Sequence, residues 1–403
     1  MIVSHDIINP DDYLLLLVDA PHYEGMMQRH QQIANRLSDK IRILYHEESA
    51  SILSYILKKN YSYDQASAHK KGLRKLKNNL WHVYSPPGLP EKLGFNWVNR
   101  KNHQTIYNNI REHIQKLGGK VIFWAAHPKS VEILDYLDYE ICIYDCYDAF
   151  GDFHEEKWKA DYIKRLERKL LEKSDLVIAS AKSLFESRKE FNDNTHLVQN
   201  GADITHFQQK LLEPSGIYPT DIAEIKRPIV GYMGDIASWL DVDAISHAAD
   251  ELPDVNFVFL GTVKRDVDIL NSKPNVHFPG RIDYVDLPYF LHYFDICTIP
   301  FLVNDMTMHV NPIKVYEYMA TGLPVISSKL PEVLELGDII HFYDNKHDLT
   351  SKIRSILNNK NNQIELSQRR IEKAMENSWD LRVMKIWELI ERTLIEKKRI
   401  KLI

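Results

Sequence analysis

The sequence predicts a two-domain α/β protein in which each domain contains a parallel sheet covered by helices. Continuous apolar runs of strand length, such as 13–18 and 121–126, occur in both halves of the chain. Strands buried on both faces have this composition, and parallel strands are usually buried on both faces. The chain has 403 residues, which is long enough for two separate hydrophobic cores.

Strands and helices are expected to alternate along both halves. Strands are predicted at 13–18, 41–45, 121–126, 140–144, 175–180, 196–198, 229–234, 255–261, 276–282 and 296–300, and the clearest helices at 27–38, 155–172, 314–321 and 381–403. Turn-forming residues between 206 and 226 indicate a linker. We therefore predict an N-terminal domain over 1–205, a linker over 206–226, a C-terminal domain over 227–378 and a final helix over 379–403.

Composition excludes several classes of protein. The net charge is −5, which gives no general electrostatic basis for binding nucleic acid. No apolar run approaches the length of a membrane span, and the N-terminus lacks the charged and apolar parts of a secretion signal. Cys142, Cys146 and Cys297 are too few for a disulfide framework or a four-cysteine metal site. We expect a reducing, cytoplasmic location.

One segment departs from the acidic balance of the chain. Between residues 55 and 80, seven lysines and arginines face a single acidic residue, Asp64, and aromatic and aliphatic residues lie between them. Such a mixture suits the surface of an anionic membrane, where the protein would bind peripherally. The alternative is a solvated helix face.

The stretch 309–328, HVNPIKVYEYMATGLPVISS, carries the strongest functional signal. A loop held out of helix by proline leads into a short helix over 314–321, which Gly322 ends. Backbone N–H groups at a helix start bind anions, and Lys314 adds a positive charge there. Glu317 lies one turn further on, where a carboxylate can accept hydrogen bonds from the two hydroxyls of a ribose. The stretch suits a nucleoside diphosphate, and the alternative is an ordinary strand–helix–strand junction.

Polar residues also follow two predicted strands of the N-terminal half. His127 comes after the strand 121–126, and Asp145 and Asp148 follow the strand 140–144. Ligands of α/β proteins bind at the carboxyl ends of parallel strands, so each of these residues could contact a substrate. Either aspartate could act as a general base for a hydroxyl group. Both could equally serve as caps of a turn or helix.

The stretch 309–328 resembles the donor-binding motif of family 4 glycosyltransferases, which have the GT-B fold. Glu317 matches the second glutamate of the family pattern, and 320–325 matches its small-residue, Gly, Pro, Val tail. His309 stands where the pattern has its first glutamate. The run 311–314, Asn-Pro-Ile-Lys, is more similar to the teichuronic-acid-type relatives, which, like the xanthan-type transferases, act in the synthesis of bacterial surface polysaccharides.

The resemblance implies a GT-B fold over nearly the whole chain, with two Rossmann-like domains and a final helix that crosses back to the first. It also implies residue roles. Donor-binding residues would be Gly234, Lys264, Arg281, His309, Asn311, Ile313, Lys314 and Glu317. Acceptor-binding residues would be Gly25, Gln28, Arg29 and Asp145. Catalytic residues would be Asp148 as the base, His127, and Lys314 at the leaving diphosphate. Lys264 and Arg265 would replace a basic pair that relatives carry near the glycines of 231–234.

The function that follows is transfer of a sugar from a nucleotide-diphosphate sugar, linked to UDP or GDP, to a hydroxyl of a saccharide or lipid-linked acceptor. No metal or other cofactor is expected, and the protein would be cytoplasmic or peripheral at the inner face of the membrane. Retention or inversion of the anomeric configuration is left open. The alternatives are a nucleotide-sugar 2-epimerase on the same fold and a two-domain ligand-binding protein without catalysis.

Overall fold

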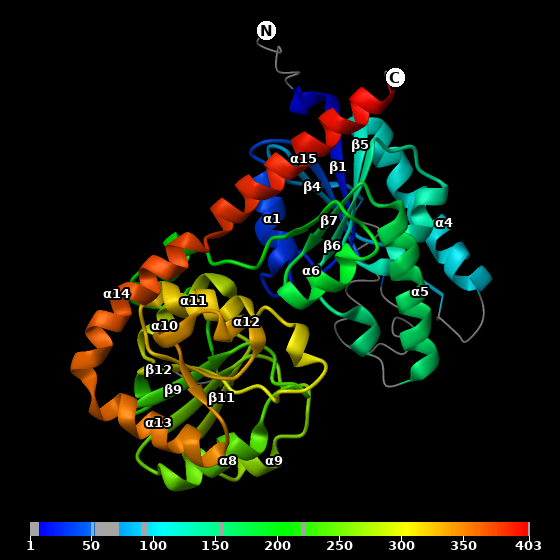
Figure 1. Ribbon diagram of the computed structural model, residues 1–403. Helices are drawn as coiled ribbons and strands as arrows, with labels where there is room; N and C mark the ends of the chain where they lie inside the picture. Colours follow the sequence, from blue (N-terminus) through cyan, green and yellow to red (C-terminus); the bar gives the residue numbers. More distant parts are fainter. Residues whose placement is uncertain are drawn as a thin grey trace. The chain divides into compact units, whose positions relative to one another are not determined.

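A computed structural model describes residues 8–49, 52, 72–89, 96–153, 156–218 and 222–401. The chain divides into two compact units (Figure 1). The N-terminal unit contains residues 1–198 together with 383–403, and the C-terminal unit contains residues 199–382. Each unit contains one sheet with helices around it, so the predicted α/β class with two parallel-sheet domains is confirmed.

The sheet of the N-terminal unit has eight strands in the order β3-β4-β2-β1-β5-β6-β7-β8. The strands are β1 (Tyr13–Ala20), β2 (Arg42–Glu47), β3 (Arg74–Lys77), β4 (Leu80–Val83), β5 (Lys120–Ala125), β6 (Ile141–Cys146), β7 (Leu176–Ala179) and β8 (Thr195–Leu197). All neighbours pair in parallel except β3 and β4. Strand β1 pairs with β2 on one side and β5 on the other, so the strand order reverses at β1. Ligand crevices of open α/β sheets lie at such reversals.

Helices of this unit follow the strands in sequence. They are α1 (Arg29–Leu37), α4 (Asn96–Leu117), α5 (Lys157–Lys173) and α6 (Lys182–Lys189), with the 3-10 helices η1 (Pro10–Asp12), η3 (Pro128–Asp135) and η4 (Phe150–Phe153). The final helix α15 (Trp379–Lys401) joins them from residue 383 onward. Its Lys397 Nζ lies 2.6 Å from a carboxylate oxygen of Asp175, which fixes the helix to this unit.

The sheet of the C-terminal unit has six parallel strands in the order β11-β10-β9-β12-β13-β14. They are β9 (Ile229–Met233), β10 (Asn256–Leu260), β11 (Val276–Gly280), β12 (Ile296–Ile299), β13 (Val325–Ser328) and β14 (His341–Tyr343). The helices are α7 (Ile204–Phe207), α8 (Val242–Glu251), α9 (Asp268–Asn271), α10 (Leu287–His292), α11 (Ile313–Thr321), α12 (Pro331–Leu334), α13 (Lys346–Asn358) and α14 (Lys360–Glu376), with η5 (Ile222–Glu224), η6 (Tyr284–Asp286), η7 (Thr307–His309) and η8 (Gly337–Ile339). Here the strand order reverses at β9.

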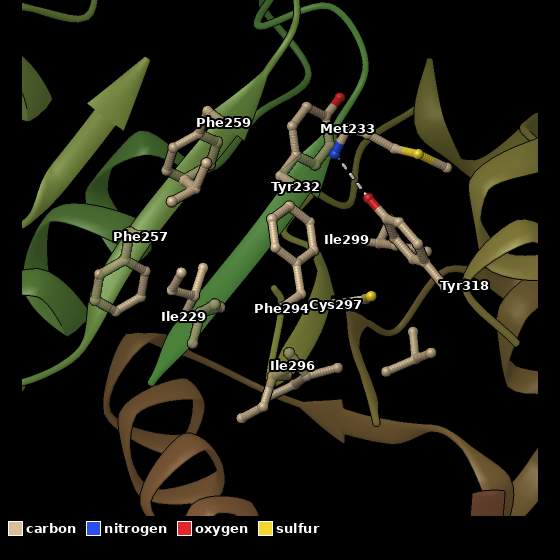
Figure 2. Packing of buried hydrophobic residues seen from close by; sticks show 14 of the residues in the cluster. Ile229, Tyr232, Met233, Phe257, Phe259, Phe294, Ile296, Cys297, Ile299 and Tyr318 are labelled. Carbon is tan, nitrogen blue, oxygen red and sulfur yellow. Dashed lines mark hydrogen bonds between the residues drawn. The ribbon is translucent and has the colours of Figure 1, made fainter. Parts of the chain in front are cut away.

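The core of the C-terminal unit joins β9 directly to α11 (Figure 2). The backbone N–H of Met233 donates a hydrogen bond of 2.8 Å to the hydroxyl of Tyr318, which is fully buried. Because Met233 ends β9 and Tyr318 lies within α11, this bond fixes the helix relative to the central strand.

The basic segment is only partly described. Lys58, Lys59, Lys70 and Lys71 lie outside the described residues. Arg74–Lys77 forms the edge strand β3 rather than a helix face, and Lys75 Nζ lies 5.6 Å from the centre of the Trp81 ring. Within the described ranges, no helix has the length and apolar character needed to cross a membrane.

A first prediction concerns Gly231 in the centre of β9. A Cβ atom at this position would lie 1.9 Å from a ring carbon of Phe294, which is fully buried. Gly231→Ala should therefore overpack the core and lower the free energy of unfolding by about 1–3 kcal/mol. Urea unfolding, followed by a spectroscopic signal from the C-terminal unit, measures this loss. Adding Phe294→Leu should recover part of this loss. A double variant whose loss equals the sum of the two single losses would contradict the predicted contact.

Candidate functional site

The predicted short helix in the stretch 309–328 is confirmed, and it begins one residue early. Helix α11 follows Pro312, whose backbone is extended, and it ends at Gly322 in the left-handed conformation with φ of 75°. The buried strand β13 then begins at Val325. The first N–H groups of a helix have no acceptor within the helix, so those of Ile313 and Lys314 can bind an anion, whereas that of Val315 donates to the Pro312 carbonyl (3.2 Å).

The loop before α11 is fixed by Asn311, which is only 4% exposed. Asn200 donates from its backbone N–H to Asn311 Oδ1 (3.1 Å) and from its side chain to the Asn311 carbonyl (2.6 Å). Asn311 Nδ2 donates to Glu332 (2.8 Å) and to the Tyr316 hydroxyl (3.0 Å). The side chain of Asn311 is thus committed to internal contacts, so the predicted donor contact can come only from its backbone.

Sequence reasoning missed two members of this arrangement. By sequence alone Asn200-Gly201 is only a turn, and no motif singles out Glu332. In the structure, Glu332 is 4% exposed and accepts hydrogen bonds from Asn311 and from Gln199 (both 2.8 Å). Asn-Gly is a common turn sequence, and this local role gives no sign that Asn200 also donates two hydrogen bonds to Asn311.

Lys314 projects from the first turn of α11 between two aromatic rings. Its Nζ atom lies 4.9 Å from the centre of the Tyr232 ring and 4.7 Å from that of Phe301. Gly234, with φ of 131°, passes directly beside it, since a Cβ there would lie 3.1 Å from Nζ. Burial lowers the pKa of Lys314 to about 8, against the opposing effect of Glu317 and Asp235. The predicted neighbours Gly234 and Lys314 are therefore brought together.

Glu317 lies one turn further along α11 and is 6% exposed. No residue of the described ranges hydrogen-bonds its carboxyl group. Burial raises its pKa to about 8, although the charge of Lys314 acts in the opposite direction. Buried carboxyl groups are normally satisfied, so this one is a candidate ligand-binding group.

The other predicted donor residues lie on separate loops. Lys264 Nζ lies 2.6 Å from a carboxylate oxygen of Asp235, so its charge is already paired in the free protein. Arg281 is exposed just beyond β11, His309 is half-buried at the end of η7, and Ile313 is the first residue of α11. The donor contacts of these residues stay predictions.

In the N-terminal unit, two of the predicted acceptor residues bind each other. The Arg29 guanidinium contacts both carboxylate oxygens of Asp145 at 2.9–3.0 Å, and His30 Nε2 lies 3.1 Å away. Burial opposes ionisation of Asp145, yet the charge of Arg29 keeps its pKa below the ordinary value. Arg29 is 2% exposed and Asp145 is fully buried. This ion pair joins α1 to β6, which is a structural role, and the acceptor contacts of both residues stay predictions.

Gly25 and Gln28 lie on the loop between β1 and α1 and are half-buried. Gln28 is the residue before α1, and its backbone N–H donates to the Gln31 side chain (3.2 Å). Gly25 closes a turn through its N–H bond to the His22 carbonyl (3.0 Å). Their acceptor-binding role stays a prediction.

Asp148 and His127 follow β6 and β5 in the N-terminal unit. Burial raises the pKa of Asp148 to about 7, which is favourable for a general base at neutral pH. His127 Nδ1 accepts a hydrogen bond from the Lys129 N–H (3.1 Å), so a neutral ring carries its proton on Nε2. In that state His127 can donate a hydrogen bond from Nε2 but cannot accept a proton there. Their catalytic roles stay predictions.

Comparison with known proteins addresses the C-terminal unit directly. Residues 221–377 match the family Glycosyl transferases group 1. These residues form a group 1 glycosyltransferase domain. The match contains Gly234, Asn311, Lys314 and Glu317, whereas Asn200 precedes the matched residues.

Known relatives and structures extend the similarity. TuaH of Bacillus subtilis (strain 168), named for a glycosyltransferase of teichuronic acid biosynthesis, is 24% identical over 234 residues, 54% of this chain and 58% of that protein. Sucrose-phosphate synthase from Thermosynechococcus elongatus superposes with a TM-score of 0.72 at 13% identity, covering 95% of this chain and 99% of that one. Anabaena HepE in complex with UDP-glucose superposes with a TM-score of 0.63 at 13% identity, covering 94% of this chain and 99% of that one. The fold is GT-B.

The raised pKa of Glu317 predicts a pH-dependent stability. In the unfolded chain the carboxyl ionises near pH 4.5, but in the folded protein it ionises only near 8. The buried neutral acid therefore contributes its full stability below the unfolded-state pKa of 4.5. This stability is lost as the pH rises through the folded-state pKa of about 8. Glu317→Gln should therefore match the wild-type melting temperature at about pH 5 and exceed it by several degrees at about pH 8.5. Glu365→Gln, an exposed control on α14, should show no such divergence, and a Glu317→Gln difference independent of pH would contradict the assignment.

Proposed function

We propose that the protein transfers a sugar from a nucleotide-diphosphate sugar to a hydroxyl group of a saccharide or lipid-linked acceptor. The observation that carries the proposal is the buried carboxyl of Glu317, which has no hydrogen-bond partner among the described residues and lies one turn from Lys314. TuaH is named for teichuronic acid biosynthesis, and HepE has been crystallised with UDP and UDP-glucose, which supports a uridine nucleotide as the donor ahead of a guanosine one.

The donor would bind across the start of α11. Its two ribose hydroxyls would donate hydrogen bonds to Glu317, which favours the ionised carboxylate and offsets the burial that raises its pKa. Its diphosphate would accept hydrogen bonds from the backbone N–H groups of 311, 313 and 314 and from the Lys314 ammonium. Residue 312 is a proline, which has no N–H to give.

Catalysis would depend on the charge that develops on the diphosphate as the bond to the sugar breaks. Fixed positive groups stabilise this charge more in the transition state than in the bound substrate. Lys314 and the helix N-terminus would supply them, so we propose a reaction that needs no divalent cation. Activity in the presence of EDTA tests this part of the proposal.

The acceptor would bind the N-terminal unit. Asp148, with its pKa near 7, would remove the proton from the acceptor hydroxyl, and such a base favours inversion of the anomeric configuration. His127 would donate a hydrogen bond from Nε2 to the bound substrate. The basic edge strand β3 would bring this unit to an anionic membrane surface, and the N-terminal loop containing Gly25 and Gln28 would border the acceptor.

A nucleotide-sugar 2-epimerase and a non-catalytic binding protein are the alternatives. Product analysis separates them from a transferase. A transferase releases free nucleotide only when an acceptor is present, an epimerase changes the sugar without an acceptor, and a binding protein leaves the nucleotide sugar unchanged.

The donor site predicts different effects for its two charged residues. Glu317→Ala should weaken binding of UDP by about 10- to 100-fold, because hydrogen bonds to a charged group contribute roughly 1.5–3 kcal/mol. The loss should disappear for an analogue without ribose hydroxyls.

Lys314→Ala should reduce turnover more than UDP affinity, because its charge acts mainly in the transition state. Calorimetry and steady-state kinetics measure the two effects. Wild-type affinity for UDP in both variants would remove the functional role of α11.

The acceptor side predicts a third effect. Asp148→Asn should lower turnover about 100- to 10,000-fold with unchanged affinity for UDP, because it removes a general base. Wild-type turnover should rise with pH through about 7 as Asp148 ionises, and this rise should be absent from the variant. If the variant keeps more than about a third of wild-type turnover, Asp148 is not the base.

A further inference from the structure

Lys314 is held by aromatic faces rather than by a carboxylate. Tyr232 belongs to β9 (Figure 2), and Phe301 follows β12 after Pro300, so both rings come from the carboxyl ends of adjacent strands. Lys314 Nζ lies 4.9 and 4.7 Å from the two ring centres and 3.4 Å from the Tyr232 hydroxyl. We define the two rings of Tyr232 and Phe301 as the aromatic cage.

The aromatic cage is rigid because each ring is fixed by further contacts. Tyr232 is fully buried, and its hydroxyl donates a hydrogen bond of 2.9 Å to the Asp235 carbonyl. Phe301 is 5% exposed, contacts Tyr232 edge-on at 6.3 Å between ring centres, and pairs through its backbone with Leu240. Gly234 lies on one side, where a Cβ atom would approach Nζ to 3.1 Å and crowd the lysine. The ammonium therefore has a defined position at the start of α11.

The charge of Lys314 is left uncompensated by this arrangement. Within the described ranges, no carboxylate oxygen lies within 4 Å of its Nζ atom, and the nearby Asp235 is instead paired with Lys264. A carboxylate would hold the ammonium but would also compete with an incoming anion. Aromatic faces attract a cation through their quadrupole and leave its net charge available.

We propose that Tyr232 and Phe301 are positioning residues that hold the Lys314 ammonium, with its charge unneutralised, at the place where an anionic leaving group develops. The identity of that anion, a nucleoside diphosphate, rests on the proposed function. The existence and effect of the cage do not, which allows the two to be tested separately.

The first test needs no nucleotide. The full chain is labelled with [13Cε]lysine, and the Lys314 signal is identified by its absence in Lys314→Arg. Ring faces this close should shift the Hε signals of Lys314 upfield of those of exposed lysines. Phe301→Leu should move the signal back and lower the pKa of Lys314 by roughly half a unit, because the rings stabilise the charged form. Phe301→Tyr should retain both properties. Phe257→Leu, which removes a buried ring of the same core from β10, should change neither.

An unshifted Lys314 signal in the wild-type protein overturns the proposal, even where Phe301→Leu fails to fold. An unchanged signal in a folded Phe301→Leu overturns it as well.

The second test uses turnover of the nucleotide sugar. Phe301→Leu should lower kcat about 3- to 10-fold with a smaller change in KM, and the alkaline limit of activity should move to lower pH. Phe301→Tyr should restore both kcat and the alkaline limit of activity. If Phe301→Leu loses no more kcat than Phe257→Leu at every pH, Phe301 has a packing role only, which overturns the proposal. Failure of the wild-type protein to bind or turn over any nucleotide sugar would remove the proposed function, while the spectroscopic result would still decide the cage.

Discussion

The partial or full burial of two ionisable groups one turn apart on α11 is the constraint on which the rest of the C-terminal unit depends. Glu317 is buried and Lys314 is half-buried, and loss of contact with water opposes the charged form of each and brings both pKa values to about 8. Such burial is costly, so it persists only where the surrounding structure holds the helix in place. Several unrelated contacts converge on α11 for this reason.

These contacts act at both ends of the helix and along its side. Asn200 donates two hydrogen bonds to Asn311 at the N-terminus, and Tyr318 joins the middle of the helix to β9. At the C-terminus, the fully buried guanidinium of Arg370 donates to the Gly322 carbonyl (3.4 Å) and to the Ile339 carbonyl (2.8 Å). A cation at this end complements the helix dipole, whose positive end is directed toward the proposed diphosphate.

The two units use the same topological feature in different ways. In both sheets the strand order reverses at the first strand, β1 or β9, and candidate residues follow that strand: Gly25 and Gln28 after β1, and Gly234 after β9. In the N-terminal unit, however, Arg29, which directly follows the loop after β1, is paired with the distant Asp145. The half-buried Asp148 is left as the acidic group whose pKa lies near neutrality, which is why the proposed base lies there.

Features that depend on neighbours in sequence could be predicted without the structure. Parallel strands are recognisable as continuous apolar runs, and a proline, a helix of nine residues and a glycine stop lie within one short stretch around α11. The sequence by itself therefore determined the fold class, the position of α11 and the placing of Lys314 and Glu317 one turn apart. Whether each charged residue is available to a ligand was decided only by the tertiary structure. Asp235 lies 29 residues from Lys264, Asn200 lies 111 from Asn311, and Arg29 lies 116 from Asp145. Periodicity and turn chemistry act over a few residues, whereas these pairings form only when the sheet brings distant strand ends together, so the candidates that they neutralise could not be recognised in advance.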